Sequence, residues 1–364
     1  YPYPVAQSIE ASNGMEYPMI CFNYGRTSAD GTYTESAKNG MLGVIIHEVG
    51  HNFFPMIVNS DERQWSWMDE GLNSFVEYLT EELYDNKFPS RGGPAWTIAD
   101  YMRLPKDQLE PIMTNSENII QFGPNAYAKP ATGLNILRET IMGRELFDYA
   151  FKTYANRWKF KHPTPEDFFR TMEDASATDL DWFFRGWFYT TDFTDIGIKE
   201  VKQYFVSNDA PKDFKAPASS RRNRLRATGP MVFMVNSTSE NYKPEMNKPL
   251  EIKEIKALDE FIKTNFKPEE IAKFDSPKYF YEVTFNKPGG LVMPIIVELT
   301  FEDGTTENHK FPAQIWRMND DEVTRTFATK KVISKIVVDP KLETADIDVT
   351  NNTWPKVEAK SKFD

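Results

Sequence analysis

Residues 36–54 combine the pattern of a buried helix with three ionisable side chains. Apolar residues cover most of the circumference of this predicted helix, and they include Met41, Leu42, Val44, Ile45, Ile46 and Val49. His47, Glu48 and His51 interrupt the pattern. An apolar helix does not bury such groups without polar partners or a metal ion. The fold must therefore bring other polar groups to this helix.

The spacing His-Glu-x-x-His suits a metal site. His47 and His51 are four residues apart, so both imidazoles lie on one helical face, with Cβ atoms about 5–6 Å apart. Neutral imidazole suits zinc, which prefers tetrahedral sites of nitrogen and oxygen. Glu48 follows the first histidine and can face the remaining position of the ion. The sequence thus predicts one Zn²⁺ ion, held by His47, His51 and a further carboxylate.

Glu70 is the candidate for the third ligand. Eighteen residues separate it from His51. Pro55 is predicted to end the first helix, and Asp69 is a good N-cap for a second one. Glu70 would then lie in the first turn of a helix that can pack beside the first, which leaves one position of the zinc ion for water.

The composition narrows the possible sites and partners. The 364 residues contain four histidines and one cysteine, Cys21, which excludes an intrachain disulfide and a thiolate zinc cluster. The formal net charge of −11 argues against a nucleic-acid partner. The two most apolar stretches, Gly40–Ile46 and Leu291–Phe301, are not membrane spans, because the first is too short and Pro294 and Glu298 interrupt the second. The sequence leaves the oligomeric state and the compartment open.

The hydrophobic pattern changes near residue 195. Before it, helical periodicity dominates; beyond it, short runs of β-forming residues alternate with turns. We predict an α+β fold, with a mostly helical domain over residues 1–195 and a small antiparallel β-sandwich over residues 276–355. Residues 196–275 are predicted to be an irregular connector with a short helix at Ala257–Phe274. The basic cluster Arg221–Arg226 is interpreted as a solvated loop.

Individual elements follow from the same patterns. An extended segment is predicted around Met19–Tyr24, and further helices are predicted at Thr132–Met142, Glu145–Lys159, Glu166–Asp174 and Leu180–Tyr189. Strands are predicted at Tyr279–Phe285, Leu291–Phe301, Glu307–Phe311, Val323–Ala328 and Val332–Val338. The dipeptide Asp303-Gly304 predicts a hairpin turn between two of them.

These motifs resemble the aminopeptidase N family of gluzincin zinc metallopeptidases. That family carries His-Glu-x-x-His, 18 residues and Glu within a helix–loop–helix. Gly14–Met19 resembles the family's G-x-M-E-N strand, Asn125–Pro130 is similar to its Y-x-K-G segment, and Trp67–Phe75 looks like its W-L-N-E-G-F-A segment. The resemblance covers residues 1–195 and implies a thermolysin-like catalytic domain. The later β-rich part is compatible with the β-sandwich that follows this domain in many members.

The resemblance also implies an activity and a role for each site residue. The activity would be a zinc-dependent aminopeptidase that removes N-terminal residues from peptides with a free amine. Glu48 would take a proton from the attacking water, and Tyr127 would stabilise the oxyanion. Glu16 would bind the α-amine of the substrate, with Gly14 and Met15 in the strand that pairs with the peptide.

The sequence departs from the family pattern at three points. Tyr17 stands where well-known members have Asn, which leaves the detail of amine recognition and specificity open. Asp69 replaces the usual Asn beside the ligand, and we interpret it as a partner of the metal ligands. The family's N-terminal β-domain lies upstream of the G-x-M-E-N strand, but only 13 residues precede Gly14. We therefore expect either a fragment or an unusual member without that domain.

Two other functions remain open from the sequence. Thermolysin-like endopeptidases also combine His-Glu-x-x-His with a distal Glu, so a zinc endopeptidase is one alternative. A peptide-binding fragment that holds zinc without activity is the other. Glu16 distinguishes an aminopeptidase from the first alternative, because its predicted role is to bind a free substrate amine. Glu48 and Tyr127 argue against the second alternative, because a scaffold needs neither side chain.

Overall fold

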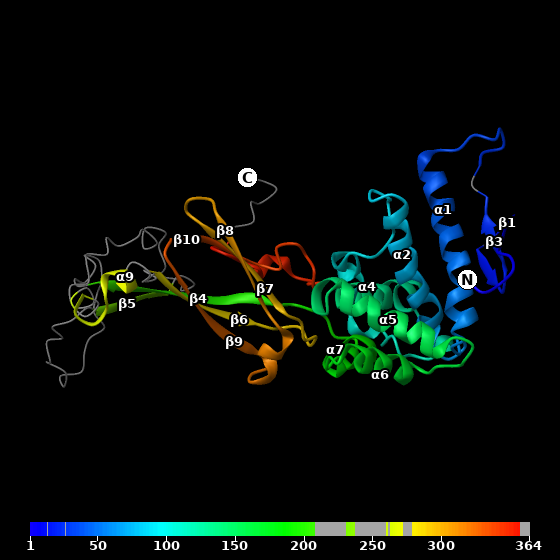
Figure 1. The fold of residues 1–364 in the computed structure, drawn as a ribbon. Helices are drawn as coiled ribbons and strands as arrows, with labels where there is room; N and C mark the ends of the chain where they lie inside the picture. Colours follow the sequence, from blue (N-terminus) through cyan, green and yellow to red (C-terminus); the bar gives the residue numbers. More distant parts are fainter. Residues whose placement is uncertain are drawn as a thin grey trace. The chain divides into compact units, whose positions relative to one another are not determined.

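The computed structural model describes residues 1–12, 14–25, 27–207, 231–236, 260, 263–271 and 279–356. The chain forms two compact units. The first consists of Tyr1–Asp195, Gly289–Pro294 and Lys341–Ile347, and the second contains the rest. Helices dominate the first unit and antiparallel strands the second, which confirms the α+β fold (Figure 1). The three-part division at residues 195 and 275 stays a prediction.

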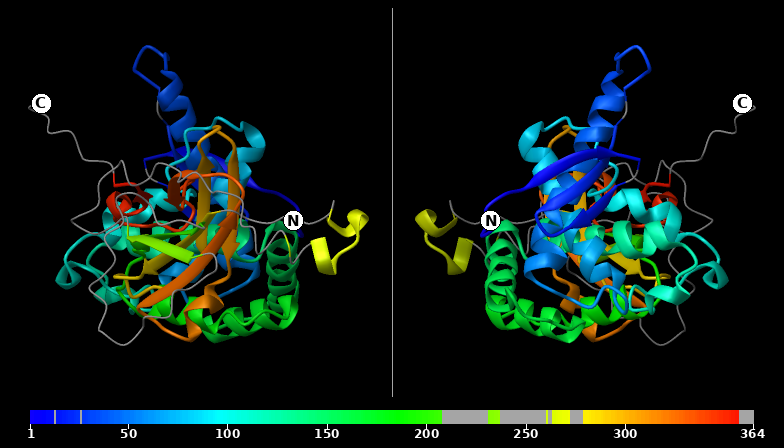
Figure 2. Two further views of the ribbon diagram at one scale, coloured as in Figure 1. Left: turned by 90° about the vertical axis from the view of Figure 1, so that its left-hand side faces the viewer. Right: turned by 90° about the vertical axis from the view of Figure 1, so that its right-hand side faces the viewer.

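A three-stranded sheet opens the first unit. Its strands are β1 (Gln7–Ala11), β2 (Met15–Tyr17) and β3 (Ile20–Tyr24), in the order β1-β3-β2. β3 runs parallel to β1 and antiparallel to β2, and it is the extended segment that the sequence predicts. Glu16 pairs with the buried Cys21, so the two side chains share a face of the sheet. The sheet lies beside the first helix (Figure 2).

That helix, α1 (Glu35–Gly50), begins at the N-cap Thr34, whose hydroxyl accepts a hydrogen bond from Ala37 N at 3.1 Å. It ends four residues before the predicted boundary. A single π-helical segment, η1 (Asn52–Ile57), follows it and contains Pro55. Phe54 already has an extended conformation there, because the residue before a proline avoids helical angles.

The prediction that α1 is deeply buried is wrong. Its six apolar side chains are only half-buried, and Gly43 and Glu48 are its buried residues. The physical reason is that a cavity of about 670 Å³ runs along one side of the helix. Gly50 serves close packing, since a Cβ atom there would clash with Asn73 Oδ1.

The second helix of the site begins earlier than predicted. A π-helical segment, η2 (Trp67–Gly71), leads directly into α2 (Leu72–Tyr84). Asp69 lies inside this helical segment and is not its N-cap, because the preceding Ser66 is already helical. Trp67 is 1% exposed and packs against the rings of Phe169 and Phe188, with centroids at 5.7 and 4.8 Å. This aromatic contact fixes the turn that carries Glu70.

The sequence predicts four helical stretches in the rest of the first unit to within a few residues. The structure has more helices there than the sequence predicts. They are η3 (Ala95–Ile98), α3 (Ala99–Met102), η6 (Gly123–Ala128), α4 (Lys129–Ile136), η7 (Leu137–Ile141), α5 (Arg144–Trp158), α6 (Pro165–Ser176) and α7 (Asp181–Tyr189), with short 3₁₀ turns at η4 (Lys106–Gln108) and η5 (Ser116–Asn118). Pro165 occupies the first turn of α6 as expected. None of the helices in the described ranges is long and apolar enough to cross a membrane.

The second unit is a sandwich of two four-stranded antiparallel sheets. One sheet has the order β5-β4-β6-β9 and the other β11-β10-β7-β8. The strands are β4 (Gly197–Ser207), β5 (Met231–Asn236), β6 (Tyr279–Asn286), β7 (Ile295–Phe301), β8 (Thr306–Phe311), β9 (Glu322–Thr329), β10 (Ile333–Val338) and β11 (Thr353–Trp354), and two 3₁₀ turns accompany them at η9 (Ala313–Arg317) and η10 (Val349–Asn351). Tyr281 Oη joins the sheets by accepting a hydrogen bond from Ile333 N at 2.9 Å.

Two predicted segments of this region differ from the structure. Gly197–Ser207 is a long strand within the predicted connector, and its polar residues hide an alternation that places Val201 and Gln203 in the interior. Strand β7 starts at Ile295 rather than Leu291, because Pro294 cannot donate to a β-ladder. The predicted hairpin at Asp303-Gly304 is confirmed.

Two other predictions in this part of the sequence concern residues that the structure describes only in part or not at all. Arg221–Arg226 lies outside the described residues, and so do residues 257–259, 261–262 and 272–274 of the predicted helix Ala257–Phe274. Within that second segment the structure describes the short helix α9 (Pro268–Ile271).

Lys129 is a buried cation in the first unit. It opens α4, is 2% exposed and donates to Thr190 O at 3.4 Å. Burial lowers its pKa from 10.5 to about 8, against the attraction of Asp192. The unfolded chain then holds this proton more tightly than the folded chain. The cost to stability is full below pH 8 and disappears as the pH rises through 10.5.

We expect the substitution Lys129→Met to raise the free energy of unfolding at pH 7 by up to about 3 kcal/mol, and to have little effect near pH 10.5. Urea unfolding at both pH values measures the difference. Lys152→Met, at an exposed position of α5, is the control and should change neither value by more than about 0.5 kcal/mol. An equal effect of Lys129→Met at both pH values would contradict the prediction.

Candidate metal centre

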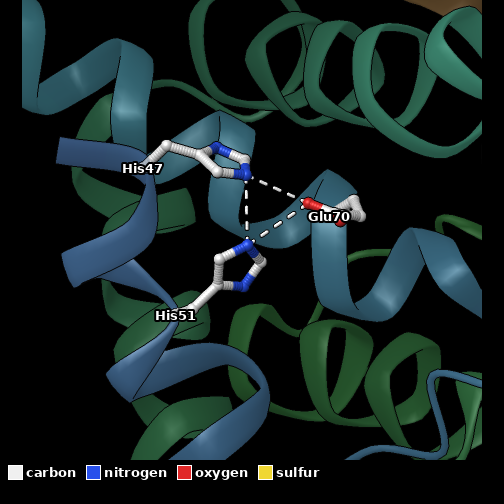
Figure 3. Close-up of side chains that lie close together, drawn as sticks. All are labelled: His47, His51 and Glu70. Carbon is white, nitrogen blue, oxygen red and sulfur yellow. Dashed lines mark hydrogen bonds and ion pairs between the residues drawn. The ribbon is translucent and has the colours of Figure 1, made fainter. Parts of the chain in front are cut away.

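Three side chains from two helical segments meet at one point. His47 and His51 extend from the end of α1, and Glu70 extends from η2 (Figure 3). His47 Nε2 lies 3.1 Å from His51 Nε2 and 3.0 Å from Glu70 Oε2, and His51 Nε2 lies 3.3 Å from the same oxygen. The structure therefore brings together the three residues that the sequence predicts as ligands.

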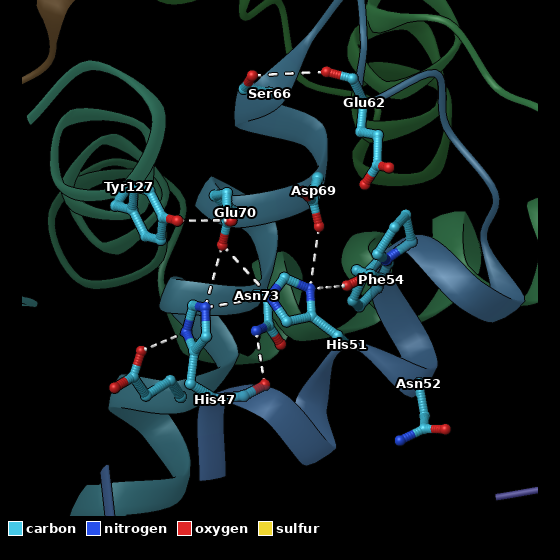
Figure 4. Close-up of polar contacts among 12 residues, drawn as sticks. His47, His51, Asn52, Phe54, Glu62, Ser66, Asp69, Glu70, Asn73 and Tyr127 are labelled. Carbon is cyan, nitrogen blue, oxygen red and sulfur yellow. Dashed lines mark hydrogen bonds and ion pairs between the residues drawn. The ribbon is translucent and has the colours of Figure 1, made fainter. Parts of the chain in front are cut away.

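The hydrogen bond made by Nδ1, the outer nitrogen of each imidazole, determines which tautomer is present and which lone pair faces the centre. His47 Nδ1 lies 2.9 Å from Glu77 Oε2, and His51 Nδ1 lies 2.8 Å from Phe54 O (Figure 4). A carboxylate and a carbonyl oxygen accept hydrogen bonds, so both Nδ1 atoms carry the hydrogen. Both Nε2 lone pairs then point to the centre, which is the arrangement of a metal-binding histidine pair.

The spacing of these atoms fits a zinc ion. Ligands at 2.0–2.1 Å from a tetrahedral ion lie about 3.3 Å apart. The three separations here are 3.1, 3.0 and 3.3 Å. Two imidazole nitrogens and one carboxylate oxygen are also the donors that zinc prefers. His47, His51 and Glu70 would hold the ion.

The surrounding carboxylates favour positive charge at the centre. Burial alone would lower the pKa of His51, but contacts with Asp69 and Glu70 outweigh burial and raise it to about 11. Burial alone would raise the pKa of Glu70, but contacts with His47 and His51 lower it to about 2. The site thus holds either protons or a metal ion, and the two compete.

Glu48 lies beside this centre on the inner face of α1. It is 7% exposed, and burial raises the pKa of its carboxyl group to about 7. Among the described residues, none donates a hydrogen bond to its Oε2 atom. A buried carboxylate oxygen without a donor is costly unless a ligand or a water molecule supplies one.

Tyr127 lies against two of the three predicted ligands, His47 and Glu70. It belongs to η6, its ring stacks on His47 with centroids 5.8 Å apart, and its hydroxyl donates to Glu70 Oε1 at 2.6 Å. Burial and the charge of Glu70 raise the pKa of this phenol, so the hydroxyl keeps its proton as a hydrogen-bond donor.

Strand β2 passes along the other side of Glu48. A Cβ atom on Gly14 would lie 2.5 Å from Glu48 Oε1, so the absence of a side chain lets the backbone approach the carboxylate. Carboxylate oxygens of Glu16 and Glu48 and a ring nitrogen of His51 lie within 4.8 Å of one another. Met15 is exposed and lines a small cavity beside the strand. The structure thus places Gly14, Met15 and Glu16 next to the centre.

The large cavity of about 670 Å³ opens onto the same centre. His47, Glu48 and Tyr127 line one end of it, and residues of α1, α2 and the loop 88–93 line the rest. This volume lies within the range of ligand-binding sites. The centre is therefore reached from a cavity large enough for part of a peptide.

Sequence reasoning missed three contacts of the ligands. Glu77 orients His47, Phe54 O orients His51, and Asn73 Nδ2 donates to His47 O at 2.8 Å. Glu77 follows Glu70 by seven residues, which is two helical turns, so its place on the same face of α2 was a usable signal. The Phe54 carbonyl had no such signal, since it depends on the bend at Pro55. The predicted contact of Asp69 is present, with Oδ1 3.0 Å from His51 Nδ1.

The site defines a class of protein, because a histidine pair on one helix, a glutamate from the next and an adjacent free carboxylate are typical of metal-dependent hydrolases. Comparison with known proteins narrows this class. The sequence pattern of the Peptidase family M1 domain matches residues 5–187. The chain belongs to peptidase family M1.

Individual relatives agree with this assignment. Glutamyl aminopeptidase of Bos taurus is 28% identical over 149 residues, covering 39% of this chain and 15% of the bovine protein. Probable aminopeptidase 1 of Sulfurisphaera tokodaii is 27% identical over 202 residues, covering 51% of this chain and 25% of that protein.

Among solved structures, Legionella pneumophila aminopeptidase A in complex with aspartic acid shares the fold. Its TM-score is 0.51 at 13% identity, over 89% of this chain and 29% of that one. Across these three proteins, the chain covers between 15% and 29% of the length of its relative.

We expect the protein to retain one zinc ion per chain after dialysis, and His51→Ala to lose it. Glu77→Gln should keep the fold but bind zinc about 10- to 100-fold more weakly, because a neutral amide oxygen accepts a weaker hydrogen bond from His47 Nδ1 than the carboxylate does. Elemental analysis and titration against a chromophoric chelator measure both effects. His162→Ala is the control, since the His162 ring contacts Asn59 O outside the site. Unchanged zinc affinity in both site variants would show that the metal is bound elsewhere.

Proposed function

We propose that this chain carries the catalytic site of a zinc-dependent aminopeptidase, which hydrolyses the first peptide bond of a substrate with a free N-terminus. The convergence of His47 Nε2, His51 Nε2 and Glu70 Oε2 beside the free carboxylate of Glu48 carries the proposal. Membership of peptidase family M1 supports it. When bound, zinc supplies a Lewis acid that polarises the scissile carbonyl group and acidifies water.

Glu48 acts as the general base and then as the general acid. Its Oε2 atom accepts a proton from the attacking water while the water oxygen bonds to the carbonyl carbon. As the C–N bond breaks, Glu48 returns the proton to the leaving amine nitrogen. Burial favours both steps because it raises the pKa of this carboxyl group to about 7, so the group takes up and releases a proton near neutral pH with little change in free energy.

Tyr127 stabilises the oxygen of the tetrahedral intermediate. Its hydroxyl keeps its proton and already points to the centre through Glu70. A hydrogen bond to a developing oxyanion is worth about 3–4 kcal/mol in comparable enzymes. Moving the hydroxyl from the Glu70 carboxylate to the oxyanion exchanges one charged acceptor for another, so the cost in the ground state is small.

Glu16 binds the ammonium group of the substrate. Its carboxylate lies near Glu48 and His51 on the strand that borders the centre, so an ammonium ion held there would place the first carbonyl group beside Glu48. Charge-assisted hydrogen bonds in an enclosed site are the strong kind. This contact would distinguish an aminopeptidase from the alternative, a thermolysin-type endopeptidase. An inactive peptide-binding fragment is the remaining alternative.

The variant Glu48→Gln should keep zinc and lose hydrolysis by about 10²- to 10⁴-fold, because the amide cannot accept the proton. Release of the anilide from an aminoacyl-anilide substrate measures turnover, and elemental analysis measures zinc. Glu145→Gln, at an exposed position of α5, is the matched control and should retain full turnover. Turnover that survives in Glu48→Gln would refute the mechanism, and absence of turnover in the unmodified protein would favour the inactive fragment.

Acetylation of the substrate amine separates the two peptidase functions. We expect an N-acetylated peptide to resist cleavage, because it carries no positive charge for Glu16, while the free peptide loses its first residue. Mass spectrometry of the products measures both reactions. Cleavage of the acetylated peptide at an internal bond would assign the chain to the endopeptidases instead.

A further inference from the structure

A second cavity, of about 290 Å³, lies beside Glu16 of strand β2. Met15, Glu16 and Tyr17 form one wall, and the segments 55–56 and 59–62 form the other. None of these residues lines the large cavity along α1. A volume at the lower end of the range for ligand sites suits a single terminal residue better than a continuing chain.

Glu62 brings a further carboxylate to this cavity. Carboxylate oxygens of Glu16, Glu62 and Asp69 lie within 4.8 Å of one another. In Figure 4 the side chain of Glu62 extends toward Asp69. The backbone of Glu62 is fixed by Ser116, whose hydroxyl donates to Glu62 O at 2.9 Å. This contact holds the backbone of the loop from which the Glu62 carboxylate reaches Glu16 and Asp69.

Two buried oxygens beside these carboxylates still need hydrogen-bond donors. Asp69 is 6% exposed, and none of the described residues donates a hydrogen bond to its Oδ1 atom. His51 Nδ1 lies 3.0 Å from that oxygen, but its single hydrogen is directed at Phe54 O. Glu48 Oε2 is the second such oxygen. The cluster is thus rich in negative charge and acceptors and poor in donors.

A protonated amine would bring both positive charge and hydrogen-bond donors to this cluster of carboxylates. An ammonium group carries one positive charge and three N–H donors. Acceptors at 2.7–2.9 Å around one tetrahedral nitrogen lie about 4.6 Å apart, which agrees with oxygens that lie within 4.8 Å of one another. The neighbouring histidine centre differs from this cluster in its imidazole nitrogens and in its shorter separations, near 3 Å.

We propose that Glu62 is a second binding residue for the substrate's N-terminal ammonium group, which Glu16 and Glu62 hold between them while the first side chain enters the 290 Å³ cavity. The inference rests on the proposed aminopeptidase function and extends it to a residue outside the family motifs. It requires a substrate with a free, charged amine and a first side chain small enough for the cavity.

The test measures peptide binding in the Glu48→Gln background, where the zinc-loaded protein does not hydrolyse the peptide. Titration calorimetry with one tripeptide gives the affinity of its free and its N-acetylated form. We expect Glu62→Gln to weaken the free tripeptide about 10- to 100-fold and to leave the acetylated form unchanged. In the protein with Glu48 intact, the same substitution should raise KM for an aminoacyl-anilide more than it lowers kcat.

Glu117→Gln is the matched control. It removes the same charge from an exposed carboxylate that pairs with Arg63, next to Glu62 in the chain, and should alter neither affinity. Glu62→Asp, which keeps the charge on a shorter side chain, should recover part of the affinity. Equal weakening of the free and the acetylated tripeptide would overturn the proposal, because a structural role would affect both. An unchanged affinity for the free tripeptide would overturn it as well.

Two measurements separate this inference from its alternatives. Loss of a second zinc equivalent from Glu62→Gln would assign the cluster to a cation instead of an amine and would overturn the proposal. If the unmodified protein releases N-terminal residues while Glu62→Gln binds the free tripeptide normally, only the role of Glu62 fails. If the unmodified protein has no such activity, the proposed function fails first.

Discussion

The site depends on the meeting of two imidazole nitrogens and one carboxylate oxygen within 3.3 Å. Two lone pairs and a negative charge at such separations repel one another unless a proton or a metal ion lies between them. The packing of α1 against η2 and α2 must supply the energy that holds them there. Gly50 lets Asn73 approach α1, and Trp67 fixes the turn that carries Glu70.

Negative charge around this centre serves more than one purpose. Glu77 and Asp69 contact the imidazoles, and Glu48 Oε2, which has no hydrogen-bond donor among the described residues, stays available for the proton transfer that we propose. Glu16 and Glu62 then extend the same acidic region toward β2. Under the proposed function, the metal ion and the ammonium group of the substrate would both bring positive charge to this acidic region.

Local patterns predicted much of the helical unit. The helices α5, α6 and α7 begin and end near their predicted residues, because amphipathic spacing and Pro165 act within a few turns of chain. The same reasoning failed for α1, whose apolar residues are half-buried, since burial depends on what packs against a helix and not on its sequence alone. It failed for β4 because lysines and glutamates on the outer face masked the alternation of the inner face.

By itself, the sequence determined the chemistry that this chain brings to its site: two histidines one helical turn apart, a glutamate between them and another glutamate after 18 intervening residues. Such spacings are local, and helix geometry converts them into positions. Tertiary structure decided the rest. Which atom orients His51 depends on the bend at Pro55, and whether Glu62 joins Glu16 depends on how a loop meets a strand 46 residues away in sequence. Contacts between distant segments arise from packing, which no periodicity within one segment encodes.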